Sequence, residues 1–231
     1  MQAEGQIASK AAYTALGVDL AGNKEILGLW IGAHESAKFW LGVLGELRNR
    51  GVEDILIACT DNLPGFSEAI GAVFSGTVVQ KCVVHQIRSS TKYVSAKDLK
   101  PLLAALRSVY SAPCEAAGRA ALEEFAALWG AKYPLCVKSW RENWGELAVC
   151  FGYPPELRRL IYTTNAIESF HRQLRKVTKA KSIFPNDAAL LKMLYLATQE
   201  VSRKWTVRLP NWGQILLQLH VLFPERVKLD D

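Results

Sequence analysis

The stretch ILIACTD, residues 55–61, decides the fold class that the sequence predicts. An almost wholly apolar run of this length is typical of a strand that is buried on both faces of a parallel or mixed sheet. Residues 78–84 form a second strand of this kind. Apolar residues at helical spacing over 36–50 and 65–74 place a helix before each of the two strands. Strands that alternate with helices in this way indicate an α/β fold.

A hairpin is predicted upstream of this stretch. Residues 11–18 and 24–31 have the composition of strands, and the segment DLAGN at 19–23 is rich in turn-forming residues. After His85 the strand signals cease, and the chain reads as helices as far as about residue 151. The predicted helices of the remaining chain cover residues 99–110, 115–129, 139–151, 166–179 and 187–202, with Asn186 as N-cap of the last and an apolar tail at 205–227 that packs on the core. We therefore predict an α/β sheet that is interrupted by an all-helical insertion.

Composition and charge exclude several classes of protein. The chain has 231 residues, of which half are apolar and 22% are charged, as in ordinary globular domains. No run of about 18 apolar residues occurs and residues 1–10 lack the apolar core of a signal peptide, so we expect a soluble cytoplasmic protein without a membrane segment. The net charge of +6 mildly favours a polyanionic partner. The odd number of cysteines without close pairs is typical of reduced thiols: Cys59, Cys82, Cys114, Cys136 and Cys150.

Asp61 is the first candidate site residue. It follows the buried strand directly, and open α/β sheets place their ligands at the carboxyl ends of such strands. An aspartate in a turn or at the N-cap of the following helix would look the same in the sequence.

Glu168 is the second candidate. Together with Asn165 it has the spacing of a capping box, in which the glutamate bonds the amide of the capping residue. The basic residues that follow favour a second interpretation, a metal ligand beside a row of phosphate-binding cations, although a solvated basic helix face is also common. Ile167, Leu174 and Val177 fall on the opposite side, as a core face would. The cations that share the Glu168 stripe are Arg172, Arg175, Lys176 and Lys179.

Cys82 and His85 form a Cys-x-x-His motif at the end of the strand predicted over 78–84. Structural zinc normally takes four protein ligands, and no convincing second pair is present, so a buried cysteine and a hydrogen-bonded histidine are the default expectation. His34, His171 and His220 show no metal-binding spacing. The chain contains neither a Gly-x-Ser-x-Gly nucleophile motif nor a glycine-rich phosphate loop, which argues against hydrolases and nucleotidases of those types.

Several segments, taken together, resemble the Mutator-like transposases of bacterial insertion sequences, from about residue 4 to the C-terminus. The segments are GLWIG at 28–32, ESAKFW at 35–40, RGVEDILIACTD at 50–61, LPGF at 63–66, QKCVVHQIR at 80–88, IYTTNAIES at 161–169, RKVTK at 175–179 and LKMLYLA at 191–197. No single segment is specific, but the combination is.

The resemblance implies a ribonuclease-H-like mixed sheet and metal-dependent chemistry on DNA. Residues 1–88 would form the first part of the catalytic core, 89–160 the helical insertion, and 161–231 the completion of the core. The family uses an Asp-Asp-Glu triad on two Mg²⁺ or Mn²⁺ ions, and Asp61 matches the second aspartate and Glu168 the glutamate. Cys82 and His85 match the family's signature near the active site. The implied reaction is phosphodiester hydrolysis at the element ends followed by strand transfer into target DNA.

The chain departs from the family pattern at its start. It begins after the position of the first strand, so no residue matches the first aspartate, and Asp19 lies in the hairpin turn instead. We therefore expect impaired cleavage by this chain alone, and a tendency to form homo-oligomers because a strand edge is left unpaired. Two alternatives stay open: a non-catalytic DNA-binding remnant of a transposase, and a metal-dependent nuclease of the same fold.

Overall fold

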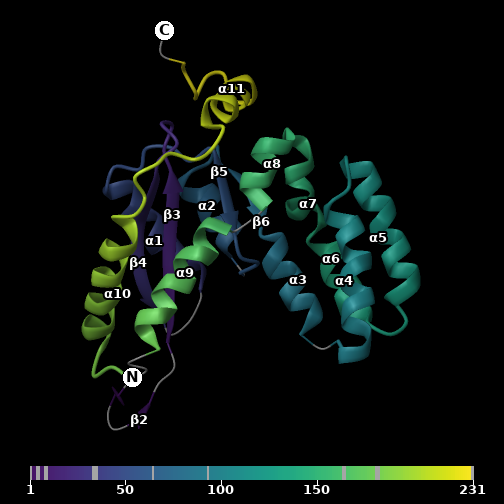
Figure 1. The fold of residues 1–231 in the computed structure, drawn as a ribbon, viewed down its shortest axis with the longest axis horizontal. Helices are drawn as coiled ribbons and strands as arrows, with labels where there is room; N and C mark the ends of the chain where they lie inside the picture. Colours follow the sequence, from purple (N-terminus) through teal and green to yellow (C-terminus); the bar gives the residue numbers. More distant parts are fainter. Residues whose placement is uncertain are drawn as a thin grey trace. The chain divides into compact units, whose positions relative to one another are not determined.

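The computed structural model shows a mixed α/β protein (Figure 1). Its elements fall into two compact units, which are described one at a time: residues 1–54, 67–75 and 165–231 form unit 1, and residues 55–66 and 76–164 form unit 2. No helix within the described residues is long and apolar enough to span a membrane. The structure describes residues 2–3, 6–7, 10–32, 36–63, 65–92, 94–162, 165–179 and 183–229.

The predicted hairpin is confirmed in unit 1. Strand β3 (Ala11–Val18) pairs antiparallel with β4 (Lys24–Gly32). Asp19 closes the turn by accepting the backbone N–H of Asn23 at 2.8 Å. Gly22 has φ +87°, a conformation that other residues rarely adopt. The short strands β1 (Gln2–Ala3) and β2 (Gln6–Ile7) pair with each other in an antiparallel manner.

A β-bulge adapts β4 to its neighbours. Ala15 pairs with Gly28 and Leu16 with Ile26, so Leu27 has no partner in the ladder. The extra residue shifts the alternation of side chains. As a result Ile26 and Leu29 both pack against the core formed with helices α9 (Asn165–Thr178) and α10 (Asp187–Ser202), which lie beside β4 (Figure 1).

The helices of unit 1 begin and end where local signals place them. Helix α1 (Ala37–Asn49) is capped by Ser36, whose Oγ accepts the N–H of Phe39 at 3.2 Å. The chain leaves this helix through Gly51 at φ +101°. Asn186 caps α10 as predicted, accepting the N–H of Ala189 at 2.9 Å. The tail forms α11 (Trp212–Leu222), and the Trp212 indole donates to the Leu20 carbonyl at 2.8 Å. Helix α2 covers Phe66–Val73.

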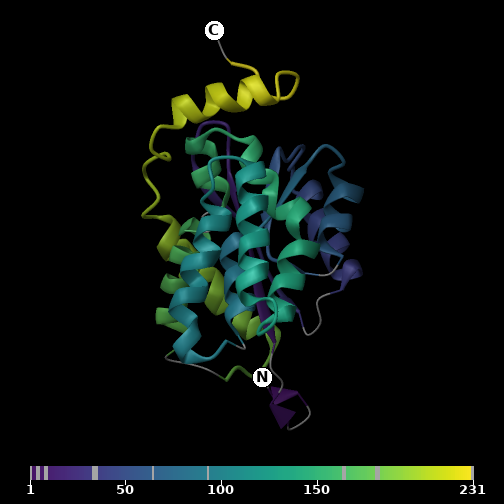
Figure 2. The same cartoon turned by 90° about the vertical axis from the view of Figure 1, so that its right-hand side faces the viewer.

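Unit 2 contains a parallel strand pair and a group of helices around one core. Strands β5 (Ile57–Thr60) and β6 (Val78–Lys81) pair in parallel. Helices α4, α5 and α6 pack side by side (Figure 2), and fully buried Leu102, Leu106 and Trp140 lie between them. The helices are α3 (Val83–Thr91), α4 (Ala96–Tyr110), α5 (Glu115–Trp129), α6 (Pro134–Glu142), α7 (Trp144–Leu147), the 3₁₀ helix η1 (Ala148–Gly152) and α8 (Pro155–Tyr162).

Three sequence-based expectations are corrected in unit 2. The strand expected over 78–84 ends at Lys81. The amide of Cys82 makes the last hydrogen bond to β5, to the Thr60 carbonyl, and the carbonyl of Cys82 already accepts the amide of Gln86 in the first turn of α3. The single helix expected over 139–151 is divided: Asn143, with φ and ψ of −92° and 1°, separates α6 from α7, and the chain continues as the 3₁₀ helix η1 from Ala148. No helix is predicted between residues 151 and 166, but α8 forms there with Pro155 as its first residue, a position that needs no amide donor.

The hydrogen bonds of the described strands join them in three separate two-stranded sheets: β1–β2, β3–β4 and β5–β6. The presence of both strands and helices along the chain confirms the predicted α/β class. The helices expected between residues 89 and 160 all belong to unit 2, together with β5 and β6.

Candidate functional site

Asp61 and Cys82 lie next to each other because β5 and β6 run parallel. Thr60 pairs with Lys81, the last residue of β6, and the amide of Cys82 donates to the Thr60 carbonyl at 2.7 Å. The next residue after each strand is therefore held at the same edge of the pair. This is the carboxyl edge, where open α/β sheets bind their ligands.

His85 joins these two residues from the first turn of α3. Cys82 is the N-cap of this helix, and a side chain three positions later lies on the same face. The Nδ1 atom of His85 is 2.8 Å from Oδ1 of Asp61 and 3.1 Å from Sγ of Cys82. As expected for the Cys-x-x-His motif, Cys82 is buried, with 1% of its surface exposed, and His85 is hydrogen-bonded.

The electrostatics of this cluster favour a charged histidine. The hydrogen bond to Asp61 and then that to Cys82 raise the pKa of His85 to about 10, against the opposing effect of burial. The side chain of Asp61 is 47% exposed, so its carboxylate pairs with His85 and also faces solvent. Its side chain therefore bonds a histidine across the strand pair, whereas helix α2 begins only at Phe66. Asp61 is therefore not the N-cap of α2, although its carbonyl accepts the amide of Leu63 at 2.8 Å in the turn that follows β5.

Three potential metal-ligand atoms converge here. A carboxylate oxygen of Asp61, Sγ of Cys82 and Nδ1 of His85 all lie within 4.8 Å of one another. The sequence places Cys82 near His85 through their spacing on one helix, but only the pairing of β5 with β6 adds Asp61.

Two residues that sequence analysis did not select, Gln80 and Lys81, hold β6 against the helices. The Gln80 side chain is fully buried and donates to the Leu147 carbonyl at 3.1 Å. Lys81 donates to Asn143 Oδ1 at 2.8 Å and forms an ion pair with Glu146. A glutamine and a lysine inside a short strand carry no recognisable sequence signal for such a role. They keep the end of β6, and so Cys82, in position.

Glu168 belongs to unit 1, in the first turn of α9. It is half-buried, while Phe170 and Leu174 on the other side of the helix are 1% and 7% exposed and pack against α10. Val177, expected on this core face, is 44% exposed, because the core between α9 and α10 ends at Leu174. The side chain of Asn165 is outside the described residues, so the capping box stays a prediction.

The four predicted cations of α9 all face solvent. All four are exposed: Arg172, Arg175 and Lys176 lie on α9 beyond Glu168, and Lys179 directly follows its last residue, Thr178. A row of exposed cations on one helix face can bind consecutive phosphates of a nucleic-acid backbone. A small hollow of about 120 Å³ on the same unit is lined by two further cations, Lys24 and Lys204. The Nζ atom of Lys24 lies 5.1 Å from the centre of the Trp205 ring.

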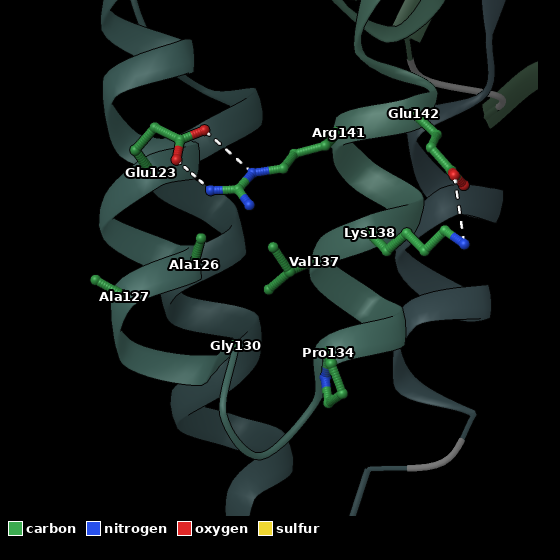
Figure 3. A pocket seen from close by; sticks show the side chains of 9 residues that line it. All are labelled: Glu123, Ala126, Ala127, Gly130, Pro134, Val137, Lys138, Arg141 and Glu142. Carbon is green, nitrogen blue, oxygen red and sulfur yellow. Dashed lines mark hydrogen bonds and ion pairs between the residues drawn. The ribbon is translucent and has the colours of Figure 1, made fainter.

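A larger groove of about 540 Å³ lies between α5 and α6 of unit 2. Figure 3 shows that an ion pair between Glu123 and Arg141 joins α5 to α6 across the top of the groove, while Lys138 and Glu142 pair with each other along α6. None of its lining residues is a predicted site residue. This groove therefore adds nothing to the candidate site.

Comparison with known proteins identifies similar sequences over almost the whole chain. Residues 1–207 match the family described as "Transposase, Mutator family". The chain is 48% identical, over 96% of its length, to a transposase for insertion sequence element ISRM3 of Rhizobium meliloti and to a probable transposase for an ISRM3-like element of Sinorhizobium fredii. It is 42% identical, over 96% of its length, to a probable insertion-sequence transposase of Corynebacterium diphtheriae. It spans 56% of the first two relatives and 70% of the third.

Proposed function

The chain belongs to the Mutator family of transposases, and we propose on this basis that it forms part of the catalytic core of a DNA transposase. The reaction would be metal-dependent hydrolysis of a phosphodiester at the element end, followed by transfer of the freed 3′ end to target DNA. The proposal includes a ribonuclease-H-like core in which residues 89–160 form a helical insertion. DNA would be its partner, both at the element ends and at the target.

The observation that carries the proposal is the position of Asp61. Its carboxylate lies at the carboxyl end of β5 and is 47% exposed. A carboxylate in this place suits the hard cations Mg²⁺ and Mn²⁺, which prefer oxygen ligands. The resemblance assigns a second such ligand to Glu168 on α9, a half-buried carboxylate in a first helical turn. The donor set thus fits the proposed ions.

We propose that Asp61 and Glu168 hold the metal pair. Divalent ions held by these carboxylates would supply activation of the attacking oxygen and stabilisation of the leaving one. The exposed cations of α9 would bind the DNA backbone and position it without reading its sequence. His85 would orient Asp61 through its 2.8 Å contact with Oδ1.

The 231 residues contain a match to two of the three carboxylates of the family triad. We therefore propose that this chain, assayed alone, binds DNA but cleaves it weakly, because two carboxylates offset less of the charge of a metal pair than three. A DNA-binding role without cleavage is the second candidate, and the exposed cations of α9 favour it. We also propose that the chain associates with copies of itself.

The experiment compares binding and cleavage by the same protein. Fluorescence anisotropy with duplex DNA over a series of salt concentrations should show log affinity falling linearly with log salt. Supercoiled plasmid with Mg²⁺ or Mn²⁺ should be nicked little or not at all. An absence of salt-dependent binding would refute the proposal for this chain.

Two further outcomes separate the alternatives. Strong Mg²⁺-dependent nicking that is abolished by Asp61→Asn would show that the two carboxylates suffice. Equal nicking of plasmids with and without element ends would indicate a nuclease of the same fold. Sedimentation of the chain without DNA measures self-association independently of both.

A further inference from the structure

We propose that Asp61, Cys82 and His85 form a binding site for a thiophilic divalent ion such as Zn²⁺. The site lies within unit 2 and is formed by residues that follow β5 and β6. It goes beyond the proposed function because it requires neither DNA nor Glu168.

The donor set supports this class of ion. A thiolate and an imidazole select Zn²⁺ and its neighbours in the first transition series, whereas Mg²⁺ avoids sulfur. Zinc sites with three protein ligands leave a fourth position for water. Cys82 is buried, but the side chains of His85 and Asp61 are 33% and 47% exposed, so solvent reaches the open side of the cluster.

The distances are compatible with one ion. Tetrahedral zinc with normal bond lengths holds a sulfur and a nitrogen ligand about 3.6 Å apart, and a nitrogen and an oxygen ligand about 3.4 Å apart. In the structure the corresponding pairs are 3.1 Å (Cys82 to His85) and 2.8 Å (His85 to Asp61). An ion therefore requires each pair to separate by roughly half an ångström, which small side-chain rotations supply. The protons displaced from the thiol and the imidazole pass to solvent.

The backbone holds the ligands ready for the ion. Cys82 is anchored by its amide bond to Thr60 and is followed by the first turn of α3, which carries His85. Asp61 comes from the adjacent strand end, at the same edge of the β5–β6 pair. Occupation of the site by Zn²⁺ would engage Asp61 and so compete with Mg²⁺ for the carboxylate that the proposed function needs.

The test uses Co²⁺ as a spectroscopic probe on the complete 231-residue chain, reduced and freed of metal. We expect a near-ultraviolet thiolate-to-cobalt charge-transfer band that saturates at one ion per chain, disappears when Zn²⁺ is added and persists in excess Mg²⁺. The band should be absent in Cys82→Ser. It should be retained in Cys114→Ser, a matched control because Cys114 is an exposed thiol at the start of α5.

Two variants at exposed positions guard against misfolding of Cys82→Ser. Asp61→Asn and His85→Gln should each weaken Co²⁺ binding at least about tenfold, the loss seen when even a residue that orients a metal ligand is removed. Circular dichroism checks that both remain folded. The proposal is overturned if no charge-transfer band forms, or if Cys82→Ser or His85→Gln binds Co²⁺ as the parent does. Since no DNA is present, these results are independent of the binding and cleavage tests above.

Discussion

The Nδ1 atom of His85 lies 2.8 Å from the carboxylate of Asp61, although one residue belongs to helix α3 and the other follows strand β5. The contact pairs a histidine with an acid at the edge of a parallel strand pair. Cys82 Sγ adds a second contact to the same nitrogen at 3.1 Å, so Asp61 and Cys82 both hold the imidazole at Nδ1.

The first prediction concerns the titration of His85 in the metal-free protein. Its pKa is raised to about 10, so two-dimensional NMR of the histidine ring should show an imidazolium throughout the neutral range. Asp61→Asn removes the largest cause of this shift, and the pKa should fall towards the ordinary value of about 6.5. Cys114→Ser should leave the titration unchanged. A parent protein that titrates near pH 6.5 would contradict the observed contact.

The sign of the linked effect on stability follows from the direction of that shift. A pKa that is higher in the folded than in the unfolded state stabilises the fold fully below about pH 6.5. This contribution is lost as the pH rises through about 10. The difference in unfolding free energy between the parent and His85→Gln should therefore be greatest at acidic pH and should shrink in alkaline buffer.

The second prediction concerns the cations of α9. Arg175→Gln combined with Lys176→Gln removes two exposed charges from the row, so the slope of log affinity for duplex DNA against log salt should decrease by about 2. Lys97→Gln combined with Lys100→Gln removes the same charge from exposed positions on α4 and is the matched control. An equal change of slope in both double variants would mean that DNA binding follows net charge and not the α9 row.

The third prediction concerns Asp98 in α4. The pKa of this carboxyl lies well below its ordinary value because Lys132, Tyr133 and Ser95 all contact it, with the Tyr133 hydroxyl donating at 2.6 Å. A lowered pKa stabilises the fold above about pH 3.8 and loses this effect as the pH falls further. Asp98→Asn should lower the melting temperature at pH 7, and the difference from the parent should shrink at pH 3.

The matched control for Asp98 is Glu124→Gln, an exposed carboxylate on α5. It should change the melting temperature little at either pH, since exposed substitutions away from specific contacts are nearly neutral. A melting temperature of Asp98→Asn that equals the parent's at pH 7 would show that these hydrogen bonds contribute nothing net.

The fourth prediction concerns two glycines with opposite environments. Gly22 has φ +87°, and a Cβ atom there would lie 2.4 Å from the Trp212 ring, so Gly22→Ala should destabilise the protein by more than about 1 kcal/mol. Gly42, inside α1, has open space around its Cβ position. Gly42→Ala should stabilise by about 0.5–1 kcal/mol because alanine favours the helix. Chemical denaturation of both variants measures the two signs, and a stabilised Gly22→Ala would refute the packing of Trp212 on the turn.

Local signals in the sequence were sufficient for much of the fold. The hairpin of β3 and β4, the capped start of α10 and the whole of α5 agree with the sequence-based expectations. Turn residues, N-caps and helical periodicity act over a few neighbouring residues, so the sequence alone carries this information. Two boundaries were predicted wrongly, the end of β6 at Lys81 and the end of α6 at Asn143. The first depends on a hydrogen bond to the neighbouring strand, and at the second the backbone leaves the helical conformation, which the spacing of apolar residues does not record.

The candidate site likewise contains features that the sequence predicts and one feature that only the tertiary structure shows. By itself the sequence identified Asp61 at the end of a strand, the Cys82–His85 motif, and Glu168 at the head of a row of cations, because each is a pattern of near neighbours. The strand before Asp61 is only partly buried, with Cys59 exposed, and not buried on both faces as its composition predicts. Only the tertiary structure decided that Asp61 and His85 are in contact. That contact depends on the parallel pairing of Thr60 with Lys81, and the register of two strands separated by a helix is set by packing and hydrogen bonds between distant segments, which no local pattern records.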